Sequence, residues 1–531
     1  MRDANRDREN LYDVVVVGSG FGAAPPALRL AEAGYRVLVL EKGPDIVPER
    51  DFRQTQSPAY FRRYLRTLSG KGLNLTFAEG LGGGSGFYEM VSLRAPSIVF
   101  DQRGEGGRPL WPDGVGRAAL DPHYDTAERM LRVEQIAAED VPKTGQVFAL
   151  LMKRLGYSCD RARYAARGCV GSGYCVSGCV FGAKQSLHLN YLPAAVAAGA
   201  EIRTDTNVAD IAPTGSDDAR SDGRALASYP PRWEIRCRSR ARGEERLRAR
   251  LLVVAAGTVG SAALLLRSKK RMPRLSRHVG RNVAFNGSVK AVGLLPREYP
   301  DGDLYVGRSH PGMVSYEFLE SHGIVVSAVK PLPLQIVAGA RLVPSGGKLE
   351  EDYWGAEHVA LMRTLRRRGL ILYATGLTPP AGRIRLRSDG TPSVSAALDA
   401  GWRRYHHEVH ALLESILARA GCAPVPVAYL DPSGTPYEEL HFFTTHQVGS
   451  CRMAESVRHG VVNASGEVFG YPGLYVSDAS SLPSSLAVNS SLTVLANAER
   501  IAAGILARHG RAPMPQTAQV TAAPHSEGGQ P

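Results

Sequence analysis

Near the N-terminus the chain reads Val14-Val15-Val16-Val17-Gly18-Ser19-Gly20-Phe21-Gly22-Ala23, and this run determines the architecture. An apolar strand leads into a Gly-x-Gly-x-x-Ala turn, and an Ala/Leu-rich helix follows. Gly18 allows the tight turn, Gly20 lets the backbone approach a pyrophosphate, and Ala23 permits close packing of helix on strand. The helix N-terminus presents unpaired N–H groups to an anion. The run therefore predicts the first β-α-β unit of a dinucleotide-binding sheet.

Glu41 completes this unit, because it follows the second apolar strand, residues 36–40. An acidic side chain at this position accepts hydrogen bonds from the hydroxyl groups of a ribose. Pro25 and Pro26 lack N–H donors, so we place them in the first turn of the helix, where those groups have no intrahelical partner. The complete unit is a far more specific signal than the glycine motif alone.

The bulk composition is that of an ordinary globular protein. A chain of 531 residues that is 44% hydrophobic predicts large cores and two or more domains. The net charge is +13, but the arginines are scattered along the chain. The run from Arg236 to Arg250 is interpreted as a solvated hairpin around Gly243. We therefore expect no nucleic-acid partner.

The N-terminus is charged and lacks the apolar core of a secretory signal. No window reaches the roughly 18 consecutive apolar residues that a membrane span needs. We therefore expect no membrane association and a cytoplasmic location. Residues 511–531 are rich in Pro, Ala, Gln and Gly and lack periodicity, which predicts a disordered tail.

Four of the seven cysteines crowd one segment, at Cys159, Cys169, Cys175 and Cys179. An odd number of cysteines in a cytoplasmic chain argues against a disulfide framework. The spacing fits no common zinc pattern, but it could hold an iron–sulfur cluster that passes electrons to a partner. Free thiols in a packed loop are the alternative, and we assign no metal ligand.

A second glycine-rich loop, Gly82-Gly83-Gly84-Ser85-Gly86, follows the first unit. Glycines remove side-chain bulk, which a closely approaching ligand or backbone requires. We assign Gly83, Gly84 and Ser85 to the cofactor site.

The remaining pattern predicts an α/β protein with two domains. A discontinuous, Rossmann-like nucleotide domain covers residues 11–300 and 441–510, and residues 120–195 form an inserted, Cys-rich cap. Residues 301–440 alternate like strands, for example at 323–329, and include a basic helical segment at 361–368, which predicts an α+β substrate domain. Further elements of the first domain are expected as strands at residues 198–203, 251–257 and 473–478 and as helices at 261–267 and 490–503.

Five motifs together resemble the glucose–methanol–choline (GMC) oxidoreductase family. Besides the two glycine motifs, they are Ala255-Ala256-Gly257-Thr258, His446-Gln447-Val448-Gly449-Ser450-Cys451-Arg452-Met453 and Val476-Ser477-Asp478-Ala479-Ser480. They occur in the family's order over roughly residues 11 to 508. The resemblance implies an FAD-binding α/β domain, an α+β substrate domain and FAD-dependent oxidation of an alcohol.

Within the family, the chain is most similar to the cholesterol-oxidase-like branch. The segment ending Gly182-Ala183-Lys184 and the run Val488-Asn489-Ser490-Ser491-Leu492-Thr493 carry this similarity. In that branch the catalytic pair is a histidine and an asparagine, which implies His446 and Asn489. Asp478 matches the residue beside the ribityl and pyrophosphate chain of the flavin.

The chemistry of alcohol oxidation is compatible with these roles. A hydride must leave carbon for the flavin while a proton leaves oxygen, and the neutral imidazole of His446 can accept that proton. Asn489 can hold the substrate oxygen without a change of charge. The helix that starts near Ser490 directs its positive end at the reduced flavin. His441, His188 and His123 lack a comparable motif and are interpreted as structural.

The substrate-side wall departs from the sterol-oxidase pattern. After Ser85 the chain reads Gly86-Phe87-Tyr88-Glu89, where those proteins carry an Asn-containing stretch. Glu317 is the candidate for the additional carboxylate base that sterol oxidases use, although no motif marks it. Together with the missing secretory signal, these departures favour a polar small-molecule alcohol.

Residues 74–94 also resemble the flavin-dependent dehydrogenases of aminoglycoside antibiotic pathways. Those enzymes oxidise the 6′-hydroxyl of a paromamine-type pseudosaccharide, so we expect this type of substrate. A net charge of +13 repels a polyamine at long range, and Glu89 is the carboxylate that could offset it locally. Sterols and long-chain alcohols are the alternative substrates. The electron acceptor is either oxygen or another oxidant.

Overall fold

The computed structural model describes residues 10–53, 57–215, 230–299, 302–304, 306–310, 312–330, 341–342, 356–425, 427–428 and 442–510. The predicted disordered tail at 511–531, and His441, lie outside these residues.

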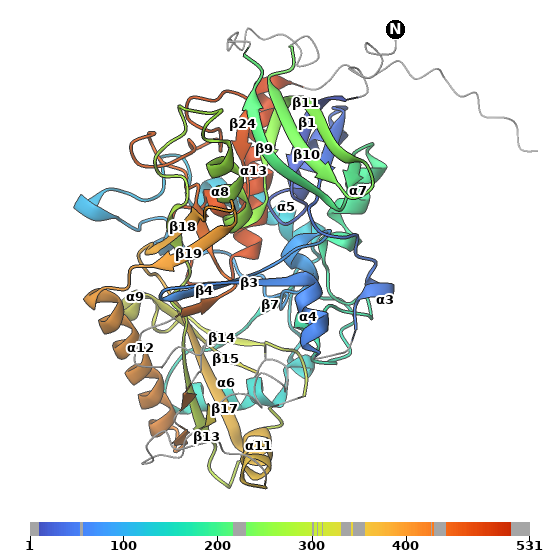
Figure 1. Cartoon of the computed structure of the whole chain (residues 1–531). Coiled ribbons are helices and arrows are strands. Elements are labelled where there is room, and N and C mark those ends of the chain that lie inside the picture. The colour runs from blue at the N-terminus through green and yellow to red at the C-terminus, as the bar shows by residue number, and fades with distance from the viewer. Residues whose placement is uncertain are drawn as a thin grey trace, which may run out of the picture.

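A sheet with β1 (Leu11–Val17) among its parallel strands forms the upper part of the molecule in Figure 1. β1 lies between β2 (Val37–Leu40) and β11 (Gly243–Val254) and is parallel to both. Val14 to Val17 are buried, as expected for a strand covered on both faces. The sheet runs in the order β8-β2-β1-β11-β10-β9, and β24 pairs with β11; the added strands are β8 (Glu201–Arg203), β9 (Thr206–Pro213), β10 (Trp233–Ser239) and β24 (Leu474–Val476).

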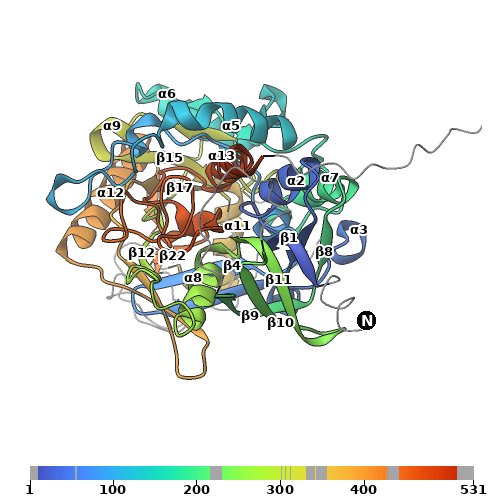
Figure 2. The ribbon, with the colours of Figure 1, turned by 90° about the horizontal axis from the view of Figure 1, so that it is seen from above.

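The first helix of the unit, α2 (Ala24–Glu32), carries Pro25 and Pro26 in its first turn, as predicted. It packs against α7 (Tyr191–Ala197) and α13 (Ser491–His509), and all three lie beside β1 in Figure 2. The predicted hairpin is also present, because β10 and β11 pair antiparallel up to Ser239 and Gly243. On the other side of the sheet, α8 (Gly257–Ser268) covers β9.

Several predicted boundaries differ from the structure. The strand expected at 198–203 is shorter, because Ala198 to Ala200 form the turn that ends α7, with Gly199 at a φ of 96°. The helix expected at 261–267 spans Gly257–Ser268, and the one expected at 490–503 continues to His509. Apolar spacing finds the middle of a helix more readily than its ends.

A six-stranded antiparallel sheet forms the lower part of the molecule. Its order is β20 (Ala423–Val425), β13 (Val289–Leu294), β17 (Gly369–Gly376), β15 (Ile324–Val329), β14 (Met313–Ser315) and β6 (Asp160–Arg161). The long helix α12 (Ala400–Arg419) packs on one face, where Leu417 contacts Gly293 closely. The opposite face does not contact α12. Thr375 lies on this face and donates a hydrogen bond to the loop before α13.

Two smaller sheets connect these layers. β22 (Phe442–Thr444) extends the hairpin of β3 (Leu65–Gly70) and β4 (Leu73–Ala78), and β23 (Val448–Ser450) pairs with β12 (Arg281–Ala284). The turn between β22 and β23 therefore lies where the two larger sheets meet. The other elements are α3 (Pro48–Asp51), α4 (Pro58–Tyr64), α5 (Arg117–Met130), α6 (Lys143–Arg154), α9 (Leu319–His322), α11 (Ala356–Arg368), β5 (Glu134–Gln135), β7 (Arg163–Tyr164), β16 (Arg341–Leu342), β18 (Gly382–Leu386), β19 (Pro392–Ala396) and β21 (Val427–Ala428).

Across the residues described above, no helix combines the length and the apolar character needed to cross a membrane.

Candidate active site

The first glycine turn packs tightly against three other segments. Gly18 has a φ of 103°, and a Cβ there would lie 2.3 Å from the Ala255 carbonyl oxygen. A Cβ on Gly83 would lie 3.0 Å from the Cα of Gly20. The two glycine motifs of the sequence thus meet backbone to backbone, and a side chain at either position would fill the space between them. Ala23 is fully buried where α2 begins.

Glu41 ends β2 and is linked to both glycine motifs. Its carboxylate accepts hydrogen bonds from the Ser19 hydroxyl at 2.6 Å and the Gly43 N–H at 2.8 Å. The Gly82 N–H in turn donates to the Ser19 oxygen at 3.0 Å. Burial raises the pKa of Glu41, while these donors stabilise its charged form. A carboxylate offers about four acceptor positions, so Glu41 can also accept from a ribose diol.

The second glycine motif forms a short 3-10 turn, Gly83–Gly86. Around Gly84 the backbone faces open space, because a Cβ there would meet nothing within 4 Å. The buried Ser85 hydroxyl donates to the Gly82 carbonyl at 2.7 Å and accepts from the Leu187 N–H at 3.2 Å. Ser85 therefore fastens the loop through its side chain, whereas Gly83 leaves room for the Gly20 backbone and Gly84 leaves room for a ligand.

Asp478 lies directly behind the first glycine turn, since a Cβ on Gly22 would lie 2.4 Å from the Asp478 Cα. Its buried carboxylate accepts from the Gly257 N–H, from the Ser261 hydroxyl, and from both the N–H and the hydroxyl of Ser480, at 2.5 to 2.8 Å. These four donors occupy the roughly four acceptor positions of the carboxylate. The side chain of Asp478 thus positions the start of α8 beside the glycine turn.

The predicted pair of His446 and Asn489 comes together over 43 positions of sequence. The Asn489 amide nitrogen lies 3.2 Å from His446 Nε2. An amide NH₂ group only donates, so Nε2 is the unprotonated nitrogen of this imidazole. His446 lies in the turn between β22 and β23, where its N–H donates to the Thr444 hydroxyl at 2.9 Å.

The environment of His446 keeps the imidazole neutral. Burial lowers its pKa from 6.5 to about 4. The ring therefore keeps an unprotonated nitrogen at neutral pH, which a general base requires.

The loop before Asn489 is held by side chains that the sequence analysis did not identify. The buried Asn286 amide donates to the Val488 carbonyl and accepts from the Leu486 N–H, both at 2.8 Å. Thr375 on β17 donates to the Ala487 carbonyl at 2.6 Å. Asn286 has a φ of 59°, and Asn tolerates this left-handed conformation better than most residues. No local motif marks these two side chains, because their partners are distant backbone groups.

Ser490 directly precedes α13, and its side chain does not cap the helix. The first N–H groups of an α-helix lack intrahelical partners. The positive end of α13 therefore begins two residues after Asn489, as expected for a helix that stabilises an anion at this site.

The other candidates from the sequence lie apart from this pair. Glu317 is exposed and accepts two hydrogen bonds from Ser158, which lowers the pKa of its carboxyl group, so it does not provide a buried base. His188 is fitted against Gly82, and burial lowers its pKa to about 4. Its position is compatible with the structural role predicted for it.

The cysteine segment does not form a metal site. Within the described part of the chain, which includes all four cysteines, no three His, Cys, Asp or Glu side chains gather so that they could hold a metal ion. Cys159 lies beside Val314, and burial raises the pKa of its thiol to about 12. The iron–sulfur alternative therefore lacks the ligand geometry that it needs.

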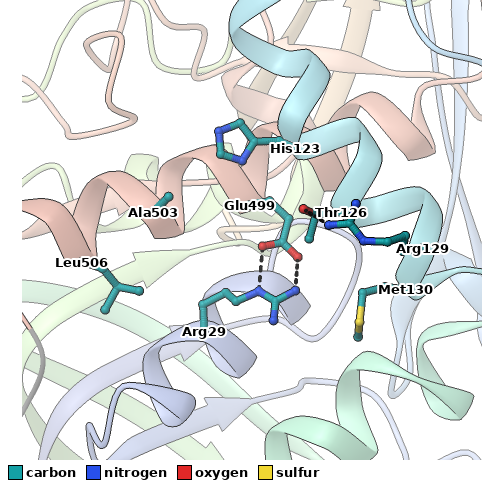
Figure 3. A pocket seen from close by; sticks show the side chains of 8 residues that line it. All are labelled: Arg29, His123, Thr126, Arg129, Met130, Glu499, Ala503 and Leu506. Carbon is teal, nitrogen blue, oxygen red and sulfur yellow. Dashed lines mark hydrogen bonds and ion pairs between the residues drawn. The ribbon is translucent and has the colours of Figure 1, made fainter.

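A cavity of about 460 Å³ lies between α2, α5 and α13 and is shown in Figure 3. On α13 it is lined from Glu499 to Leu506, whereas Asn489 precedes the helix, so this cavity is separate from the catalytic pair. Its centre is the ion pair of Arg29 with Glu499, and it also exposes His123.

The residues at the two glycine motifs fit the cofactor FAD. The backbone at Gly20 and Gly84, which carries no side chains, and the buried carboxylate of Glu41 match the needs of a pyrophosphate and a ribose. The pair of His446 and Asn489 and the N-terminus of α13 are the candidates for the reacting end of the site.

Comparisons with known proteins agree with this geometry. Residues 14–286 and 378–498 match the N-terminal and C-terminal models of GMC oxidoreductase. The chain is 27% identical to a cholesterol oxidase of Mycobacterium tuberculosis, over 92% of this chain and 90% of the relative. It is 26% identical to the long-chain-alcohol oxidase FAO4B of Arabidopsis thaliana, over 95% of this chain and 69% of the relative.

A solved structure shares the fold. The crystal structure of pyridoxine 4-oxidase from Mesorbium loti superimposes with a TM-score of 0.61 and 17% identity, over 93% of this chain and 98% of the other. The family models cover more than half of the sequence in the order expected from its motifs. The chain therefore belongs to the GMC oxidoreductase family, uses FAD and oxidises alcohols.

Proposed function

We propose that the protein oxidises an uncharged alcohol to a carbonyl compound, with His446 as the base and Asn489 as the residue that holds the substrate oxygen. The observation that carries this proposal is the contact of 3.2 Å between Asn489 and His446 Nε2. It brings an amide donor and a neutral imidazole nitrogen to one place, where an alcohol oxygen that replaces their mutual hydrogen bond can accept from the amide and donate to the imidazole.

Each residue has a separate task in this proposal. Bound FAD accepts the hydride. His446 removes the hydroxyl proton through Nε2, which its depressed pKa keeps unprotonated. Asn489 donates to the substrate oxygen as negative charge develops there. Asn286 and Thr375 hold the loop that carries Asn489.

The electrostatics around Glu89 favour an uncharged substrate. Burial raises the pKa of Glu89, and Lys184, Lys290 and Lys330 oppose that shift because they act on it as nearby positive charges. A carboxylate that is balanced by three ammonium groups does not attract a polyamine. Oxidation of an aminoglycoside 6′-hydroxyl remains a prediction without this support. The relatives named cholesterol oxidase and long-chain-alcohol oxidase favour sterols or long-chain alcohols, with oxygen as the electron acceptor.

Anaerobic mixing of the purified flavoprotein with single alcohols tests the proposal. A sterol, a long-chain alcohol and paromamine are mixed separately with the enzyme, and loss of flavin absorbance reports hydride transfer. We expect one of the two uncharged alcohols to bleach the flavin and paromamine to leave it unchanged. Bleaching by paromamine alone would replace the proposed substrate class with the aminoglycoside prediction.

The variant His446→Ala tests the base. We expect the rate of flavin reduction to fall by about 10² to 10⁴, the usual contribution of general-base catalysis. His123→Ala is the matched control, because His123 lines the separate cavity of Figure 3. A wild-type rate of flavin reduction in His446→Ala would remove His446 from the mechanism.

A further inference from the structure

Lys184 carries an ammonium group in a place that almost excludes water, because the residue is only 1% exposed. The ammonium donates to three backbone carbonyls, those of Gly86 at 2.9 Å, Tyr88 at 2.8 Å and Cys175. An ammonium has three donors, so this set satisfies all of them.

One of these carbonyls belongs to Gly86, the last residue of the glycine turn Gly83–Gly86, and another belongs to Tyr88, which follows that turn. The third, on Cys175, belongs to the cysteine segment, so the ammonium joins the two. Neighbours of Lys184 bind the same loop. The Tyr88 hydroxyl donates to the Gln185 carbonyl at 3.0 Å, and the Leu187 N–H donates to the Ser85 oxygen at 3.2 Å. Residues 184–187 thus run along the glycine loop and are hydrogen-bonded to it at several positions.

The arrangement fixes the orientation of peptide groups. A peptide bond is planar and trans, so the Tyr88 carbonyl and the Glu89 N–H point in opposite directions. Because Lys184 holds that carbonyl, the Glu89 N–H points away from Lys184. It makes no hydrogen bond to another described residue. It is therefore a donor that the loop can offer to a ligand.

The residue after Glu89 shows that this segment needs to be held. Met90 has a φ of 64°, which a non-glycine residue with a long side chain rarely adopts. Such a conformation persists only where the surroundings impose it. The Met90 carbonyl accepts from the Ala165 N–H at 2.9 Å, and Ala166 bridges to Lys184 on the same side.

We propose that Lys184 is a positioning residue for the cofactor, whose ammonium ties the Gly86–Tyr88 backbone to the cysteine segment and so maintains the shape of the flavin-facing glycine loop. In this interpretation the cysteine segment supports the loop and has no redox role. Burial lowers the pKa of Lys184 to about 8, and Glu89, Cys175 and Cys179 act against that shift. The three carbonyls also oppose the lowering of this pKa, because they bind the charged form of the lysine.

The test uses Lys184→Met, which keeps the length of the side chain and removes the ammonium. We expect the dissociation constant of FAD, titrated into the apoprotein, to rise about tenfold or more, as for loss of hydrogen bonds to a charged group. The absorbance band of bound oxidised FAD should shift. Amide hydrogen exchange should increase in peptides covering residues 82–90.

Arg368→Met is the control. Arg368 is half-buried and its guanidinium donates to a backbone carbonyl, that of Leu295 at 2.7 Å, but neither residue belongs to the glycine loop. If Lys184 had only a structural role, both variants would lower the melting temperature and leave FAD affinity, the flavin spectrum and loop exchange unchanged. That outcome for Lys184→Met would overturn the proposal.

A second variant covers the case in which Lys184→Met does not fold. Tyr88→Phe removes only the hydrogen bond to the Gln185 carbonyl. We expect it to raise the FAD dissociation constant by about two- to tenfold. An unchanged FAD affinity and unchanged loop exchange in this variant would contradict the proposal. All readouts use oxidised FAD without substrate, so they are independent of the proposed roles of His446 and Asn489.

Discussion

The depressed pKa of His446 sets the pH range in which the base can work. Only the neutral imidazole accepts a proton, and burial lowers the pKa from 6.5 to about 4. We expect the rate of anaerobic flavin reduction to stay constant from neutral pH down to about pH 5 and to fall near pH 4. The measurement is the reduction rate at low substrate concentration across this range. A fall centred near pH 6.5 would indicate that the imidazole is not desolvated.

The same shift has a consequence for stability. A histidine whose pKa is lower in the folded state binds fewer protons there than in the unfolded chain. The contribution of His446 to folding is therefore complete above about pH 6.5 and is lost progressively as the pH falls toward 4.

Asn489→Asp tests the contact between the two side chains directly. A carboxylate 3 to 4 Å from an imidazole stabilises the imidazolium, so the pKa of His446 should rise. We expect the acidic limb of flavin reduction to move upward by one pH unit or more. Asn489→Ser, which stays neutral, should slow the reaction without moving the limb. An identical pH profile for Asn489→Asp and the parent enzyme would show that the two groups do not interact.

At the level of the elements, Asn286 connects the end of β12 to the loop that carries Asn489. Asn286→Ala removes two buried hydrogen bonds to the backbone at Leu486 and Val488. We expect a loss of about 1–3 kcal/mol in the free energy of unfolding and a slower flavin reduction. Asn463→Ala is the control, because Asn463 accepts from two N–H groups of another loop. It should lower stability to a similar degree and keep the reduction rate.

The ion pair shown in Figure 3 joins α13 to α2. Arg29 makes two hydrogen bonds of 2.9 Å to Glu499, which also accepts from the Tyr191 hydroxyl of α7 at 2.7 Å. Glu499→Gln should lower the free energy of unfolding by about 1–3 kcal/mol, less than for a fully buried pair because Arg29 is partly exposed. Urea denaturation measures this loss. Glu32→Gln removes the exposed partner of Arg29 and should cost less than about 0.5 kcal/mol; equal losses would contradict this assignment.

Some elements of the fold could be predicted from the sequence, and others could not. The strand at Leu11–Val17, the first turn with its prolines and the position of Glu41 are local patterns, so they could be predicted. His446 and Asn489 were identified by resemblance, because nothing in their spacing shows that two separate loops converge.

The supporting side chains could not be predicted in this way. Asn286, Thr375 and Lys184 act on backbone carbonyls that lie far away in the sequence. Side chain to backbone contacts of this kind leave no periodicity and require no particular residue at the partner position. The cysteine cluster is a different case, because its spacing left an iron–sulfur cluster open as an alternative to free thiols, and only the fold shows that in the described part of the chain these cysteines do not gather as metal ligands.

In the whole molecule, the cofactor site draws on segments from both ends of the chain. The first glycine turn there meets the second glycine loop and the backbone of Asp478, and β24, which precedes Asp478, lies beside β11 in the same sheet. A ligand that binds only this assembled form stabilises it by RT ln(1 + [FAD]/Kd), or about 4 kcal/mol at a thousandfold excess over Kd. We therefore expect the melting temperature of the apoprotein to rise steadily with the logarithm of the FAD concentration. Calorimetry over a range of FAD concentrations measures this slope. Adenosine diphosphate lacks the flavin end, so it leaves the start of α13 uncontacted and should raise the melting temperature less at equal concentration. An equal rise would show that the stabilising contacts are limited to the glycine turn and Glu41.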